Sequence, residues 1–172
     1  GLVKFYSDDK KRAFKDFDKA IKLNSNFATA YNNLGILFID EKNFKEALIY
    51  LNRAIKLNPN SAQSYSNRGI SYVELGEEDL AFKDFSKAID TSSKFSIPYL
   101  NRAILQKKWH RLNEAIDDLD YAIKLNVKYA KAYFERANVK IELNDIEGAK
   151  KDLVKAIELG YKEAIPELEN LS

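Results

Sequence analysis

The dipeptide Ala-Ile returns at a constant interval of 34 residues along the whole chain. It occurs at Ala20-Ile21, Ala54-Ile55, Ala88-Ile89, Ala122-Ile123 and Ala156-Ile157. A segment of that length is one supersecondary unit that does not bury its apolar face alone, so successive units have to stack into a continuous core. The chain is therefore predicted to be an array of repeats, and its functional residues have to be sought on the surface of that array.

Each unit carries aromatic, small and aliphatic side chains at the same places. In the first half an aromatic residue is followed four positions later by a small one, and in the second half Ala is followed four positions later by Leu or Phe. Such spacings place the side chains on one face of an α-helix. The recurring residues are Tyr31, Tyr65, Tyr99 and Tyr133 with Gly35, Gly69, Ala103 and Ala137, then Ala47, Ala81, Ala115 and Ala149 with Leu51, Phe85, Leu119 and Leu153. Each unit is expected to be two antiparallel helices, called helix A and helix B.

These positions resemble the tetratricopeptide repeat family, whose unit of about 34 residues has aromatic, small and aliphatic residues in the same order. The resemblance covers the whole chain and implies an all-α fold, a right-handed superhelical solenoid of antiparallel helix pairs. It implies a single solenoid over residues 1–172, in which 1–27 is an incomplete repeat and 164–172 begins a capping helix. The complete repeats are residues 28–61, 62–95, 96–129 and 130–163.

The turn from helix A to helix B is predicted near Lys42, Gly76, His110 and Asn144. Gly and Asn suit the left-handed conformation in which many helices end. His110 is the only histidine of the chain, and its place in the repeat favours a helix-end residue over a catalytic base.

Composition excludes several classes of function. With 28 Lys and Arg against 26 Asp and Glu, the net charge of +2 gives no strong field for a polyanion, so nucleic-acid binding is not expected. No segment approaches the roughly 18 consecutive apolar residues of a membrane span, so no membrane insertion is expected. The chain has no Cys and one His, and it lacks a glycine-rich phosphate loop. No catalytic residue, metal ligand or cofactor is therefore predicted, and the chain is not expected to be an enzyme.

A short basic and aromatic cluster covers residues 107–111, with the sequence Lys-Lys-Trp-His-Arg. It lies at the predicted end of a helix A, where the exposed carbonyl groups favour cations. We interpret it as a helix terminus, with an acidic stretch of a protein partner or a nucleic acid as the alternatives.

Arginine and aspartate occur together, 16 residues apart, in three of the four complete repeats. The first repeat has Leu34 and Tyr50 at the two places. The Arg position lies beside those that face helix B, so a charge there would be partly desolvated and would need a partner. The sequence predicts a structural ion pair in each of the three repeats, and the alternative is that the charges are exposed and co-occur by chance. The predicted pairs are Arg68 with Asp84, Arg102 with Asp118, and Arg136 with Asp152.

The face of helix A opposite the core is predicted to bind a partner. Asn recurs on it one repeat apart, and a parallel track of Ile runs beside the Asn residues. An amide both donates and accepts, so it can pair with the main chain of an extended peptide, while Ile would contact apolar side chains. The residues assigned to partner binding are Asn33, Ile36, Asn67, Ile70, Asn101, Ile104, Lys131, Phe134 and Asn138.

In tetratricopeptide repeat proteins this face lines the concave groove of the superhelix, where extended peptides or partner helices lie. The three asparagines Asn33, Asn67 and Asn101 resemble the ladder of the glycosyltransferases that attach N-acetylglucosamine to Ser and Thr. Two alternatives stay open: Asn is common at this place across the family, and the Ile track could be packing between repeats.

One activity of the family, the clamp for the acidic tails of heat-shock chaperones, is not matched. The clamp needs Lys and Asn on one helix A, Asn on the next, and Lys and Arg on the third. Only the middle Asn is present, as Asn67 or Asn101, with Lys131 as one further match. A chaperone co-factor of that type is not expected.

The sequence thus favours a protein-protein interaction scaffold that binds an extended or helical segment of a partner protein. The alternative is a structural segment of a longer repeat array or multiprotein assembly, acting through its ends. The incomplete repeat at 1–27 favours this alternative, under which changes near Leu2, Phe5 and Tyr6 would disrupt assembly.

Overall fold

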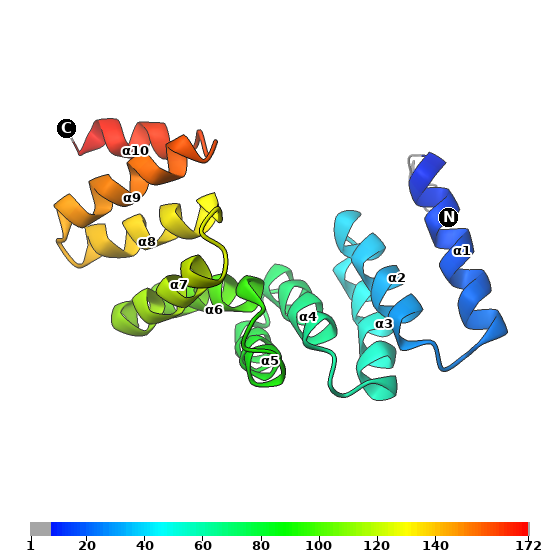
Figure 1. Cartoon of the computed structure of the whole chain (residues 1–172). Coiled ribbons are helices and arrows are strands. Elements are labelled where there is room, and N and C mark those ends of the chain that lie inside the picture. The colour runs from blue at the N-terminus through cyan, green and yellow to red at the C-terminus, as the bar shows by residue number, and fades with distance from the viewer. Residues whose placement is uncertain (1–7, 172) are drawn as a thin grey trace. The chain divides into compact units, whose positions relative to one another are not determined.

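The computed structural model describes residues 8–171, and all regular secondary structure in that part of the chain is helical (Figure 1). The helices are α1 (Asp8–Leu23), α2 (Ala28–Asp40), α3 (Phe44–Leu57), α4 (Ala62–Glu74), α5 (Glu78–Thr91), α6 (Ser96–Lys108), α7 (Leu112–Leu125), α8 (Ala130–Glu142), α9 (Ile146–Glu158) and α10 (Ala164–Asn170). The all-α fold is confirmed. Leu2, Phe5 and Tyr6 lie outside the described residues.

The chain divides into two compact units, Gly1–Thr91 and Ser92–Ser172, which we call unit 1 and unit 2. Within unit 1, α2 pairs with α3 and α4 with α5; within unit 2, α6 pairs with α7 and α8 with α9. Each pair is antiparallel, because only three residues join helix A to helix B, as between Asp40 and Phe44, and such a short turn brings the chain back alongside itself. In each pair α2, α4, α6 or α8 is the helix A of its repeat.

Every helix A ends in a left-handed residue, as predicted. The backbone φ is 57° at Lys42, 79° at Gly76, 56° at His110 and 63° at Asn144. In each turn the next amide bonds back to the carbonyl five residues earlier, for example Asn43 N to Phe38 O at 2.8 Å. This closure satisfies carbonyl groups that the helix end would otherwise leave free. His110 is confirmed as a helix-end residue.

The core of unit 1 depends on glycine where helix A crosses helix B. Leu51 and Phe85 are fully buried, and each lies directly against a glycine of helix A. A methyl group on Gly69 would lie 2.6 Å from Cε1 of Phe85, well inside van der Waals contact. The absence of a side chain at Gly69 therefore allows a ring to pack between α4 and α5.

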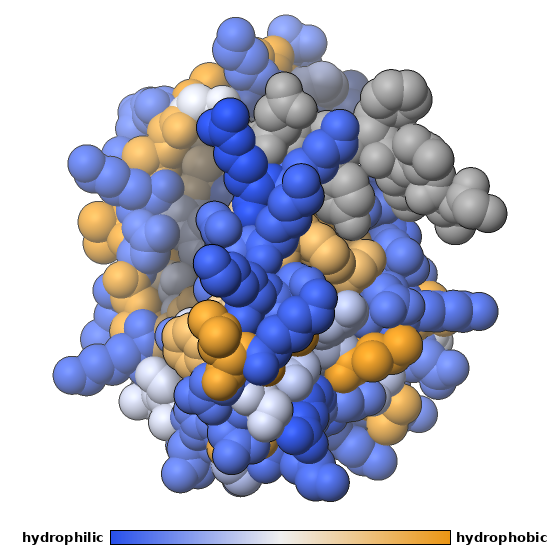
Figure 2. Space-filling view, turned by 90° about the vertical axis from the view of Figure 1, so that its right-hand side faces the viewer, coloured by the Kyte–Doolittle hydropathy of each residue, from blue (hydrophilic) through white to orange (hydrophobic). Residues whose placement is uncertain are grey.

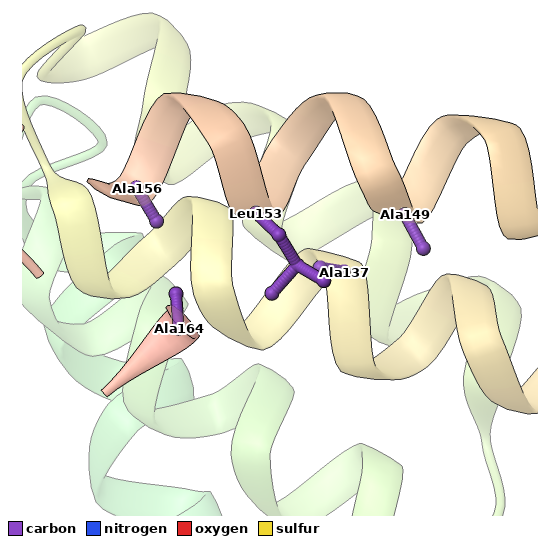
Figure 3. Close-up of a cluster of buried hydrophobic side chains, with 5 residues drawn as sticks. All are labelled: Ala137, Ala149, Leu153, Ala156 and Ala164. Atoms are coloured by element: carbon purple, nitrogen blue, oxygen red, sulfur yellow. The ribbon is translucent and has the colours of Figure 1, made fainter. Parts of the chain in front are cut away.

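In unit 2 the C-terminal helix closes the core. Ala137 of α8, Ala149, Leu153 and Ala156 of α9, and Ala164 of α10 gather in one buried cluster (Figure 3). Half-buried rings and aliphatic side chains surround it: Tyr133, Phe134, Ile141, Ile157, Tyr161, Leu168 and Leu171. The small side chains let the helices approach closely, and α10 covers apolar surface that α9 would otherwise expose.

On the face of the molecule in Figure 2, hydrophilic side chains cover most of the visible surface, and hydrophobic ones form separate small groups. Scattered apolar side chains of this kind are normal on a protein surface. Among the described helices, none has both the length and the apolar character needed to cross a bilayer.

Candidate functional site

The predicted binding residues of unit 1 lie on the sides of α2 and α4 that the core does not use. Leu34 and Gly35 of α2 are buried, whereas Ile36 on the same helix is 37% exposed. Asn33, Asn67 and Ile70 are half-buried. Each of the two helices thus presents one amide and one aliphatic side chain at the surface.

A hydrogen-bond network links these amides, and its centre is a residue that the sequence pattern did not select. Asn32 Oδ1 accepts from Nδ2 of Asn67 and from Oγ of Ser64, both at 3.1 Å. Asn32 Nδ2 reaches Asn33 Oδ1 at 3.5 Å. Asn67 therefore bonds the residue beside Asn33, because the two helices are offset by one position. The signal for it, a second Asn at position 32, is present only in the first repeat.

A polar hollow of about 410 Å³ opens beside this network. It lies between the amino-terminal ends of α2 and α4 and the loop that leads into α4. The residues that line it are Ala28, Thr29, Asn32, Asn33, Asn58, Asn60, Ser61, Gln63 and Ser64. None of them is charged or aromatic, so the hollow can offer hydrogen bonds but neither a counter-charge nor a stacking surface.

A second hollow, of about 600 Å³, is open and lies on α2 and α3. It is lined by Tyr31, Ile49, Tyr50, Asn52, Arg53 and Lys56. The Arg53 guanidinium lies 5.8 Å from the centre of the Tyr31 ring, a cation–π contact that occupies the ring face. Ile49 is 61% exposed, which makes it a helix B counterpart of Ile36.

In unit 2 the predicted residues fall into three different environments. Asn101, Ile104 and Asn138 are half-buried, and Lys131 is exposed. The ring of Phe134 lies 5.0 Å, centre to centre, from that of Tyr161. Phe134 therefore has a partner within the chain, which the repeat pattern did not reveal because Tyr161 follows the last complete helix pair.

An ion pair also connects the helices A of unit 2. Lys107 Nζ of α6 lies 3.0 Å from Glu135 Oε2 of α8, and the side chains are only 23% and 14% exposed. Next to it, the Arg111 guanidinium lies 5.3 Å from the centre of the Trp109 ring. Three members of the basic and aromatic cluster thus have partners within the chain, which agrees with its interpretation as a helix terminus.

Each predicted Arg and Asp pair is brought together in the structure. Arg68 donates from Nε and one terminal nitrogen to the two carboxylate oxygens of Asp84, both at 2.7 Å. Arg102 binds Asp118 in the same way at 2.7 Å, and Arg136 binds Asp152 at 2.6 and 2.8 Å. The Asp side chains are 6–8% exposed and the Arg side chains 17–20%. This two-point geometry suits a partly buried pair.

Further partners of these pairs were missed from the sequence. Arg68 also donates to Asn52 Oδ1 of α3 at 2.7 Å, and Arg136 to Asp120 Oδ1 of α7 at 2.6 Å. Each of these Arg residues therefore joins its own helix B to the preceding one. Asp120 is exposed but paired. The signal was a second spacing of 16 residues, this time before the Arg.

Electrostatics keep the guanidinium groups charged. Burial acts to lower the pKa of Arg68, but hydrogen bonding and Coulomb attraction to Asp84 outweigh it and raise that pKa. For Arg136 burial is again opposed by Asp152 and Asp120, which raise its pKa above the usual value. The pairs are consequently fixed charges that hold the repeats together.

Within residues 8–171, no group of three or more His, Asp or Glu side chains is arranged to hold a metal ion. The arrangement of the described residues thus offers hydrogen bonds, aliphatic contact and fixed charge for binding.

Comparison with known proteins gives matches in family and fold. Three family models, each described as a tetratricopeptide repeat, match residues 28–61, 50–83 and 130–159. A search of curated proteins finds no match. The solved structure of MamA is 23% identical, covers 93% of this chain and 99% of its own, and has a TM-score of 0.75.

Two further similar structures are described as binding peptides. YrrB, a TPR protein with an unusual peptide-binding site, is 21% identical over 94% of this chain and 84% of its own, with a TM-score of 0.72. The first TPR of Spaghetti (RPAP3), bound to the HSP90 peptide SRMEEVD, is 29% identical over 64% of this chain and 89% of its own, with a TM-score of 0.62.

Proposed function

Because the chain belongs to the tetratricopeptide repeat family, we propose that it is a protein-interaction scaffold whose helices A bind an extended or helical segment of a partner protein. The observation that carries the proposal is the surface of α2 and α4 in unit 1. These helices leave Ile36 exposed and Asn33, Asn67 and Ile70 half-buried, and Asn33 also lines the polar hollow. Aliphatic and amide groups side by side suit a peptide, which presents both apolar side chains and main-chain amides.

Unit 2 contributes a similar surface. Ile97 of α6 is 37% exposed, Ile104 and Asn101 are half-buried, and Lys131 at the start of α8 is exposed. No hydrogen bond of the Asn101 or Asn138 side chain is formed within the described part of the chain. Phe134 is left out of the proposed surface because Tyr161 packs against it.

The similar structures that bind peptides support this class of function, since they share the fold. The peptide bound to Spaghetti (RPAP3) contains two Glu and one Asp. The predicted binding residues of unit 1, by contrast, are all uncharged. We therefore expect a partner different from an acidic tail.

The proposal is tested with one substitution and a matched control. Peptides are first selected on the wild-type protein from a library of random linear peptides. Ile36→Glu is expected to weaken their binding at least about tenfold, or 1.4 kcal/mol, because a peptide would have to bury the new carboxylate without a partner. Titration calorimetry provides the affinities.

Ile49→Glu is the control, since it makes the same change at an exposed position of α3. It should leave the affinity unchanged, and both variants should keep the wild-type helical circular dichroism. Loss of binding in Ile49→Glu with retention in Ile36→Glu would place the ligand on the helix B side. A library without binders, or binders insensitive to both changes, would favour the alternative in which the chain acts through its ends.

A further inference from the structure

Hydrogen bonds order part of the lining of the hollow between α2 and α4. Asn58 Oδ1 accepts from the Asn60 amide at 3.1 Å, which fixes the loop before α4. Ser61 caps α4 by accepting from the Ser64 amide at 3.2 Å, and the two hydroxyls lie 2.8 Å apart. Ser64 is 1% exposed and continues the chain of hydrogen bonds to Asn32. The loop backbone and the wall at Ser64 are thus ordered before any ligand arrives, which reduces the entropic cost of binding.

Several polar groups on these walls are left without an intramolecular partner. In the described part of the chain, no hydrogen bond is formed by the side chains of Thr29, Asn60 and Gln63, or by Nδ2 of Asn33 and Asn58. These groups include donors and acceptors in similar numbers. A ligand in the hollow would therefore find both kinds of hydrogen-bonding group around it.

The lining also limits the chemistry of that ligand. No cation lines the hollow, so a carboxylate would meet dipoles but no counter-charge, and no carboxylate lines it to receive an ammonium or guanidinium group. No aromatic ring lines it, so a sugar ring would lack a stacking surface. The volume of about 410 Å³ lies in the range of about 300–1,000 Å³ found for ligand pockets.

We propose that this hollow is a specificity subsite that receives an uncharged polar side chain, an amide or a hydroxyl, from the bound segment. A primary amide is the best complement, because its donor and acceptor can pair with Asn33 and Gln63 at once. The inference rests on the proposed function, to which it adds the side-chain class that the site selects. The pocket contains Asn33 but neither Asn67 nor Asn101, and it includes loop residues, so it is distinct from the asparagine series as a whole.

The test introduces a negative charge into the peptide and then a positive charge into the pocket. Peptides selected on the wild-type protein are remade with each Gln or Asn replaced in turn by Glu or Asp. At one position of the peptide, this change is expected to weaken binding to the wild-type protein about tenfold or more. Gln63→Lys should reverse the preference at that position, so that the acidic peptide binds better than the amide peptide. Gln63 is exposed, so the variant should fold normally.

The matched control is Lys56→Gln on α3, which changes the charge near the second hollow and should leave the preference as in the wild type. Wild-type selection of acidic or basic residues at the sensitive position would overturn the proposal. An amide preference that Gln63→Lys does not alter would also overturn it. After either of these outcomes, weaker binding to Ile36→Glu would still support the proposed function. A library without binders would count against the proposed function and the subsite proposal alike.

Discussion

Replacing Asp84 with Ala is expected to lower the free energy of unfolding by roughly 2–3 kcal/mol, because it leaves the Arg68 guanidinium half-buried without its carboxylate. Urea denaturation followed by circular dichroism measures the loss. Lys83→Ala, an exposed change on the same helix, should alter stability by no more than about 0.5 kcal/mol.

The first repeat supplies the template for a sharper version of this experiment. It has Leu34 and Tyr50 at the places of the ion pair, and Tyr50 stacks on Phe38 with ring centres 5.2 Å apart. The double variant Arg68→Leu with Asp84→Tyr should therefore be more stable than Asp84→Ala alone, since it leaves no unpaired charge. Equal stability of the two variants would contradict the view that the unpaired charge of Arg68 is what destabilises Asp84→Ala.

Gly69→Ala is expected to lower the free energy of unfolding by about 1–3 kcal/mol, because the added methyl group overlaps the buried ring of Phe85. The third and fourth repeats have Ala and Leu at these two places, and all four residues are buried: Ala103 and Leu119, and Ala137 and Leu153. Adding Phe85→Leu to Gly69→Ala should accordingly recover most of the loss. Phe85→Leu alone should cost about 1 kcal/mol, because it leaves a void beside Gly69.

Chemical denaturation of the wild type, the two single variants and the double variant gives the unfolding free energies of a double-mutant cycle. The free-energy losses should not add, because the two substitutions compensate each other. Additive losses would contradict the close packing of Gly69 on Phe85 as the cause.

The features that the repeats share could be predicted, because the same residue spacings recur from one repeat to the next. Helix pairing and the left-handed turns follow from spacings that recur in every complete repeat, and the contacts between Arg and Asp from a spacing that recurs in three of them. Asn52 and Asp120 as additional partners were in principle visible, since they too lie 16 residues from the Arg they bind.

Contacts that occur in only one repeat could not be predicted from the repeat pattern. Asn67 bonds Asn32 rather than the matching Asn33, because the neighbouring helices are offset. Phe134 packs against Tyr161, and the corresponding places of the earlier repeats hold no aromatic residue from which this contact could be expected. The polar hollow combines a loop with two helices, so its shape depends on how consecutive repeats meet.

The central claim is that ligands bind to the helix A surface, and nuclear magnetic resonance mapping with a selected peptide tests it most directly. Backbone and side-chain amide signals are assigned, and their shifts are followed as the peptide is added. The account predicts that the largest shifts in unit 1 fall on α2 and α4, including the side-chain amides of Asn33, Gln63 and Asn67. Shifts confined to α3 and α5, with those amides unchanged, would contradict it.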